Sequence, residues 1–153
     1  MSNPFVQKEM KKVLESTDYP QNMALASAWA IAHFKGINIK IFDVSRVSSL
    51  CDYNVIASAE NVTQARAMID EIQHNLKQAG AKMIAAEGLS DGEWILLDMG
   101  DVIIHVLQDL SREAYDLDSL WADSPQVKIP TEFYFGAGVE AQQEEKETAE
   151  NYF

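Results

Sequence analysis

Cysteine is nearly absent: Cys51 is the single one among 153 residues. One cysteine cannot form an internal disulfide bond, so none is expected to stabilise this chain. No apolar run approaches the ~20 residues that a membrane-spanning helix needs. The N-terminus, MSNPFVQKEMKK, lacks the apolar segment of a signal peptide. We therefore expect a cytoplasmic protein that makes no membrane contact.

Motifs for phosphate, metal and covalent chemistry are also missing. The seven glycines form no phosphate-binding loop. His33, His74, His105 and Cys51 are far apart and share no metal-ligand spacing. Cys51 would meet His105 only if their strands were neighbours on one face, so we favour a structural role for Cys51. We expect no cofactor, no bound metal and no enzymatic activity.

Positive charge is scarce, with 12 basic residues against 24 acidic ones and a net charge of −12. Residues 37–121 alone contribute −8 (6 − 14) and the tail from Glu140 contributes −4 (1 − 5). Phosphate-backbone binding needs clustered Lys and Arg, so we expect no direct nucleic-acid recognition. An acidic domain suits a basic protein partner, because charge complementarity speeds their encounter.

Hydrophobic periodicity predicts an α/β fold in which a mixed five-stranded sheet is packed with helices. The pattern predicts helices over 4–15, 22–34 and 61–79, strands over 37–44, 51–59, 82–87, 93–99 and 102–108, and short helical pieces over 110–116 and 117–121. Asn22 is a reasonable cap for the second helix, and Asn61 with Gln64 has capping-box spacing at the third. The pattern leaves the strand order open.

The chain divides into three parts by composition and pattern. Residues 1–20 form an N-terminal helical extension, residues 21–125 form the domain, and residues 126–153 form a C-terminal extension. The acidic tail from Glu140 carries few apolar residues, so we expect it to be mobile.

The hairpin around Gly100 separates two faces most clearly. A turn at Gly100 and Asp101 and a turn at Met99 and Gly100 give the same two faces, because the pairing differs by two residues. One face is uniformly apolar and is expected in the core: Ile95, Leu97, Met99, Val102, Ile104 and Val106. The other face mixes apolar and polar side chains: Trp94, Leu96, Asp98, Ile103, His105 and Leu107. Such a face is either covered by a helix that satisfies its polar groups or used to bind a partner.

Each polar residue near this face has a structural and a functional interpretation. Asp98 and His105 would form either a general base with its orienting group or a cross-strand contact that fixes the hairpin, and we favour the second. Trp94 suits the core or the centre of a protein interface. Arg112 lies among several acidic residues, so we expect it to be ion-paired.

Several short motifs, taken in order, resemble the ribosomal silencing factor family, also called Iojap-like. They are Phe42-Asp43-Val44, Ser48-Ser49, Cys51-Asp52-Tyr53, Glu87-Gly88-Leu89, the run Gly92 to His105 (GEWILLDMGDVIIH), Arg112 to Leu117 (REAYDL) and Leu120-Trp121. The resemblance runs from about Ala24 to Pro125. Met99 departs from it, since the family usually has an aromatic residue there.

The resemblance implies a fold like that of nucleotidyltransferases without their catalytic carboxylates. It also implies binding to the large ribosomal subunit at the protein numbered fourteen, on the face that meets the small subunit. Members block subunit joining, repress translation notably under nutrient limitation, and are commonly homodimers when free. The implied partner-binding residues are Trp94, Leu96, Asp98, His105, Arg112 and Tyr115.

Two other function classes remain open alternatives. One is a metal-dependent, nucleotidyltransferase-like enzyme that uses Asp98 and Asp101, although it would need a phosphate-cradling loop and two acids on one strand. The other is a dimeric scaffold whose hairpin face pairs with itself.

Overall fold

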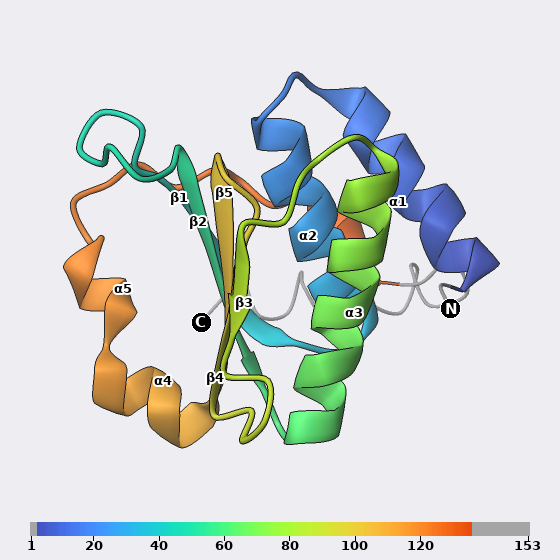
Figure 1. Ribbon diagram of the computed structural model, residues 1–153. Coiled ribbons are helices and arrows are strands. Elements are labelled where there is room, and N and C mark those ends of the chain that lie inside the picture. The colour runs from blue at the N-terminus through green and yellow to red at the C-terminus, as the bar shows by residue number, and fades with distance from the viewer. Residues whose placement is uncertain (1–2, 136–153) are drawn as a thin grey trace, which may run out of the picture.

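The computed structural model describes residues 3–135 and contains a five-stranded mixed sheet in the order β1-β2-β5-β4-β3 (Figure 1). The strands are β1 (Ile37–Asp43), β2 (Tyr53–Ala59), β3 (Ala85–Glu87), β4 (Trp94–Asp98) and β5 (Val102–Gln108). The helices are α1 (Pro4–Ser16), α2 (Gln21–His33), α3 (Val62–Gln78), α4 (Asp109–Tyr115) and α5 (Leu117–Leu120), followed by a 3-10 turn, η1 (Thr131–Tyr134). The α/β fold with a mixed sheet is confirmed.

The β4–β5 hairpin has the predicted faces, and its turn is the first of the two that the sequence allows. The Met99 amide donates to the carbonyl of Val102 at 2.9 Å, so the turn is Gly100–Asp101. Gly100 has a φ of 90°, a backbone conformation that glycine adopts without strain. All six residues of the predicted apolar face are buried in the main core. The other strand boundaries shift inward, because pairing begins at Tyr53 rather than Cys51 and at Ala85 rather than Lys82.

The central strand pair, β2 and β5, is parallel, and Tyr53 lies opposite Val102. Helix α3 connects β2 to β3, which lies at the edge of the sheet opposite β1. Strands β4 and β5 follow in the chain and occupy the positions between β3 and β2. This order places β2 beside β5 although their residues are about fifty positions apart, and it brings side chains of both strands to the same surface.

Helices α2 and α3 begin differently from each other. The Asn61 side chain accepts the amide of Gln64 at 2.8 Å, as predicted for the start of α3. Asn22 does not cap α2, because that helix already begins at Gln21 after Pro20. The Asn22 side chain instead donates to the carbonyl of Leu14 at 2.9 Å and so links α2 to the end of α1.

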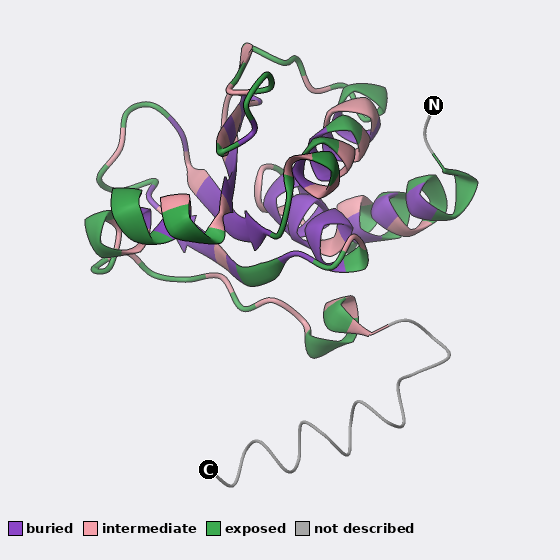
Figure 2. Cartoon of the chain, turned by 90° about the horizontal axis from the view of Figure 1, so that it is seen from below, coloured by how far each residue is buried: buried purple, intermediate pink, exposed green. Residues whose placement is uncertain are grey.

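Helices cover both faces of the sheet (Figure 1). Helices α1, α2 and α3 lie on one side and enclose the main core. The N-terminal extension takes part in this core, since Val6 and Met10 of α1 are fully buried. Helices α4 and α5 lie on the opposite side, over a smaller cluster centred on Phe42, Ile56 and Leu107. Figure 2 shows that these two short helices remain largely exposed.

The segment after α5 runs along the β1 edge of the sheet. Asp43 donates its amide to the carbonyl of Pro125 and Val127 donates to Ile41, each at 2.8 Å. This backbone pairing covers the β1 edge, where unpaired groups would otherwise invite association with other strands. The acidic tail from Glu140, which was expected to be mobile, lies outside the described residues.

Candidate protein-binding face

The α4–α5 face is an exposed surface of aromatic and aliphatic side chains next to the hairpin. We define it by Trp94, Leu110, Tyr115, Leu120 and Trp121. Leu110 is 83% exposed, Leu120 is 69% exposed and Tyr115 is 56% exposed, whereas the two tryptophans are half-buried. The rings of Trp94 and Tyr115 pack together with centroids 4.8 Å apart. Exposed apolar side chains on two consecutive short helices mark a surface that suits a partner.

Acidic residues lie on the same two helices and next to them or to Trp94 in the chain. Exposed carboxylates lie there at Glu93, Asp109, Glu113, Asp116 and Asp123. An apolar centre with a charged rim is the usual anatomy of a protein interface. The sign of the rim fits a basic partner.

His105 lies beneath the face and is only 5% exposed. Its Nδ1 accepts the indole N–H of Trp94 at 3.2 Å, and its Nε2 lies 3.0 Å from Oδ1 of Asn54 on β2. An indole nitrogen can only donate, so Nδ1 is unprotonated and Nε2 carries the hydrogen. Burial lowers the pKa of His105 from 6.5 to about 4, which keeps the ring neutral.

The interpretations of an Asp98–His105 pair are both wrong, because both nitrogens of His105 are engaged by other residues. Asp98 lies opposite Ile103 on β5, and Leu96 lies opposite His105. The Asp98 carboxylate instead accepts the amide of Gly100 at 2.9 Å and stabilises the hairpin turn locally. Asp98 and Leu96 are both half-buried.

Arg112 is ion-paired, as the surrounding acids predicted, and it is 8% exposed. Its Nε donates to Oδ2 of Asp118 at 2.7 Å, and its Nη2 donates to Oδ1 at 2.9 Å. Its Nη1 donates to the buried hydroxyl of Ser58 on β2 at 3.1 Å. The hydrogen bonds from Arg112 hold the pKa of Asp118 well below its usual range. Arg112 therefore supports α4 from beneath.

The six residues proposed from the resemblance thus divide into two groups. Trp94 and Tyr115 belong to the α4–α5 face, and Leu96 and Asp98 lie half-buried on the same side of the sheet. His105 and Arg112 are buried beneath it and can affect a partner only through the residues they hold. As partner contacts, all six remain predictions.

Sequence reasoning missed two exposed members of the face, Leu110 and Leu120. Both belong to short amphipathic pieces in which an apolar residue is expected to turn toward the core. Leu117 does so and is 8% exposed. Helices of four and seven residues carry too few positions for a periodic pattern to show which leucine faces solvent.

Cys51 does not form a nucleophilic pair with His105. Strands β2 and β5 are neighbours, but His105 lies opposite Ile56 and Cys51 lies before the first paired residue of β2. Cys51 is buried beside Phe42 in the smaller cluster. Burial raises the pKa of its thiol to about 11, and nearby carboxylates add to the effect, so it is an unreactive packing residue.

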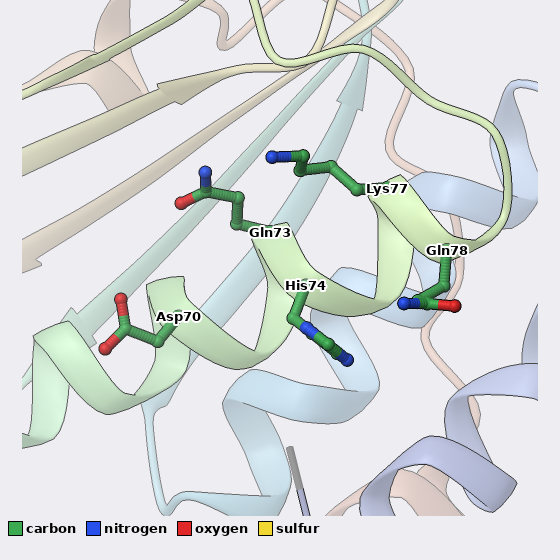
Figure 3. Close-up of a pocket in the computed structure, with 5 residues that line it drawn as sticks. All are labelled: Asp70, Gln73, His74, Lys77 and Gln78. Atoms are coloured by element: carbon green, nitrogen blue, oxygen red, sulfur yellow. The ribbon is translucent and has the colours of Figure 1, made fainter. Parts of the chain in front are cut away.

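A polar hollow on α3 lies on the other side of the sheet (Figure 3). Its lining residues all come from one helix: Asp70, Gln73, His74, Lys77 and Gln78. Gln73 and Lys77 extend to one side of that helix and His74 and Gln78 to the other, so the side chains do not converge.

Within residues 3–135, no group of three His, Cys, Asp or Glu side chains is arranged to hold a metal ion. No helix in that part of the chain is long and apolar enough to span a bilayer.

Known proteins resemble this chain over part or most of its length. The chain is 34% identical over 101 residues to a ribosomal silencing factor of Chromobacterium violaceum. The aligned residues make up 66% of this chain and 83% of the relative. A crystal structure from the same organism superimposes with a TM-score of 0.58 at 29% identity, over 90% of this chain and 96% of that one. The mouse protein "Mitochondrial assembly of ribosomal large subunit protein 1" is 30% identical over 73 residues, which is 46% of this chain and 32% of that protein.

The family description that matches is "Ribosomal silencing factor during starvation", over residues 17–152. This match includes the hairpin, both short helices of the α4–α5 face and the covered β1 edge. The chain therefore belongs to the ribosomal silencing factor family.

Proposed function

We propose that this protein binds the large ribosomal subunit through the protein numbered fourteen and thereby prevents the small subunit from joining. Bound there, it would repress translation by occupying a surface that the two subunits need for contact, notably when nutrients are limiting. The action is steric and requires no bond to be made or broken.

The observation that carries the proposal is the exposed α4–α5 face. Exposed apolar area on this face comes from Leu110, Tyr115 and Leu120, and no other part of the described chain covers it. The ring of Trp94 packs against the ring of Tyr115. Aromatic residues at the centre of such a patch supply much of the affinity in protein interfaces. The acidic rim suits a basic ribosomal protein, because opposite charges speed encounter and disfavour the wrong orientation.

Two further points support a ribosomal partner. Family membership connects the chain to ribosomal silencing, and the mouse relative is named for assembly of the large subunit.

When free, the protein is proposed to form homodimers, as family members commonly do. It is proposed to act in the cytoplasm, where subunits join.

A subunit-joining experiment tests this proposal. Purified small and large subunits are mixed under conditions that favour joining, and light scattering follows the formation of the joined ribosome. The wild-type protein, incubated first with large subunits, should lower the joined fraction in proportion to the amount added. The double variant Leu110→Ala with Tyr115→Ala should leave joining near the level without protein. Unchanged joining at saturating wild-type protein would contradict the proposal.

A further inference from the structure

One carboxylate ties together three elements beneath the α4–α5 face. Asp118 of α5 receives two hydrogen bonds from Arg112 of α4, at 2.7 and 2.9 Å. Lys40 of β1 approaches the same carboxylate, with its Nζ 2.9 Å from Oδ1. The remaining guanidinium nitrogen of Arg112, Nη1, donates a hydrogen bond to the hydroxyl of Ser58 on β2. The guanidinium is thus held on both sides, by α5 and by the sheet.

The ion pair spans a turn that contains a left-handed residue. Asp116 joins α4 to α5 with φ 47° and ψ 50°, a conformation that glycine adopts freely and that aspartate, among the other residues, adopts occasionally. Helix α5 has four residues and no side-chain hydrogen bond at its N-terminus. Helices this short are not stable on their own. Contacts from outside the turn must therefore hold the two helices at their observed angle.

The position of the α4–α5 face depends on that angle. Tyr115 is the last residue of α4, directly before the turn, and its ring rests on Trp94. Trp121 follows α5, and its ring packs 5.5 Å from His105 and 5.9 Å from Phe42. The exposed Leu120 is the last residue of α5. Loosening the turn would let these side chains move independently.

We infer that the Arg112–Asp118 ion pair is a positioning clasp, which closes the α4–α5 turn and holds the face in its binding arrangement without touching the partner. The inference rests on the proposed function for what the face binds. Arg112 thus has a supporting role, and its planar guanidinium group, with several N–H donors in a fixed geometry, suits that role. A lysine would keep the charge but could not make two parallel bonds to Asp118 and a third to Ser58.

The first test concerns the free protein and needs no ribosome. Backbone amide hydrogen exchange is measured for residues 109–121 and, as an internal reference, for α3. Asp118→Asn and Arg112→Lys should speed exchange in 109–121 by roughly tenfold and leave α3 unchanged, because only the local opening becomes easier. Glu113→Gln is the matched control: it removes the same charge from an exposed position on α4. Unchanged exchange in Asp118→Asn would overturn the clasp.

The second test measures affinity for purified large subunits under conditions in which each variant is fully folded by circular dichroism. Asp118→Asn should bind about tenfold more weakly than wild type, within the range by which residues outside a contact modulate binding. A role limited to global stability would leave this affinity unchanged, and so would overturn the positioning role. Wild-type protein that fails to bind large subunits would contradict the proposed function, while the exchange result would still decide whether the clasp exists.

Discussion

Trp94 of β4 donates its indole hydrogen to Nδ1 of His105 on β5 at 3.2 Å, diagonally across the hairpin. This bond fixes the plane of the indole ring against which Tyr115 packs. Asn54 holds the opposite nitrogen of the imidazole, so the ring has one tautomer and one orientation. The buried side chains of Asn54 and His105 therefore set the position of the half-buried Trp94, and through it that of the exposed Tyr115.

The neutral state of His105 makes the stability of the protein depend on pH. Its pKa is about 4 when folded and 6.5 ordinarily, so between these values the unfolded chain binds a proton that the folded chain does not. The free energy of unfolding should therefore fall as the pH drops from 6.5 toward 4, by at most about 3 kcal/mol from this group. Chemical denaturation across this window measures the slope.

The control for this prediction is His105→Gln, which cannot titrate. Its unfolding free energy at neutral pH is expected to be lower than that of wild type, because the bonds to Trp94 and Asn54 are disturbed. Its slope between pH 6.5 and 4 should be smaller than the wild-type slope. Equal slopes in the two proteins would show that His105 is not the group responsible.

Gly88 and Gly80 form a matched pair for a stability test. Both have positive φ, at 79° and 100°, but a Cβ atom at Gly88 would lie 1.9 Å from the carbonyl oxygen of Trp94, whereas Gly80 has open space. Gly80→Ala should cost about 1 kcal/mol from backbone strain alone. Gly88→Ala should cost more than about 3 kcal/mol, because the clash is with backbone beside the face. Similar midpoints in thermal unfolding for the two variants would contradict this account.

Tyr115 should contribute to binding much more than to folding. It is 56% exposed, so Tyr115→Ala should change the unfolding free energy by less than about 1 kcal/mol. If it is an interface anchor, the same change should weaken binding to large subunits by about 2 kcal/mol, which is roughly thirtyfold. Tyr134→Ala serves as the control, because Tyr134 is 43% exposed on η1, which packs against α2 on the other side of the sheet. Equal losses for both variants would argue against the α4–α5 face.

The hairpin could be predicted from local sequence because two short-range rules act together. Alternation fixes which residues share a face, and Gly100 places the turn to within one residue, so the faces of Ile95 and Leu97 follow, whereas their exact partners do not. The partner of His105 could not be predicted in this way. Asn54 lies 51 residues earlier, and only the parallel pairing of β2 with β5 brings the two together.

Arg112 shows the same limit for the candidate site. Its ion pairing was predictable from the nearby acids, but its burial was not. Burial depends on α4 folding back over β2, where Ser58 receives the third hydrogen bond. Local composition tells which charges are available, whereas the packing of short helices onto a sheet decides which of them reach solvent.

Co-sedimentation with purified ribosomal particles shows whether the protein binds the large ribosomal subunit. The protein is mixed separately with small subunits, large subunits and joined ribosomes, and each mixture is resolved on a sucrose gradient. We expect the protein to travel with large subunits alone, because the small subunit and the joined particle do not present the free surface. Folded protein that travels with none of the particles, or equally with small subunits, would contradict this expectation.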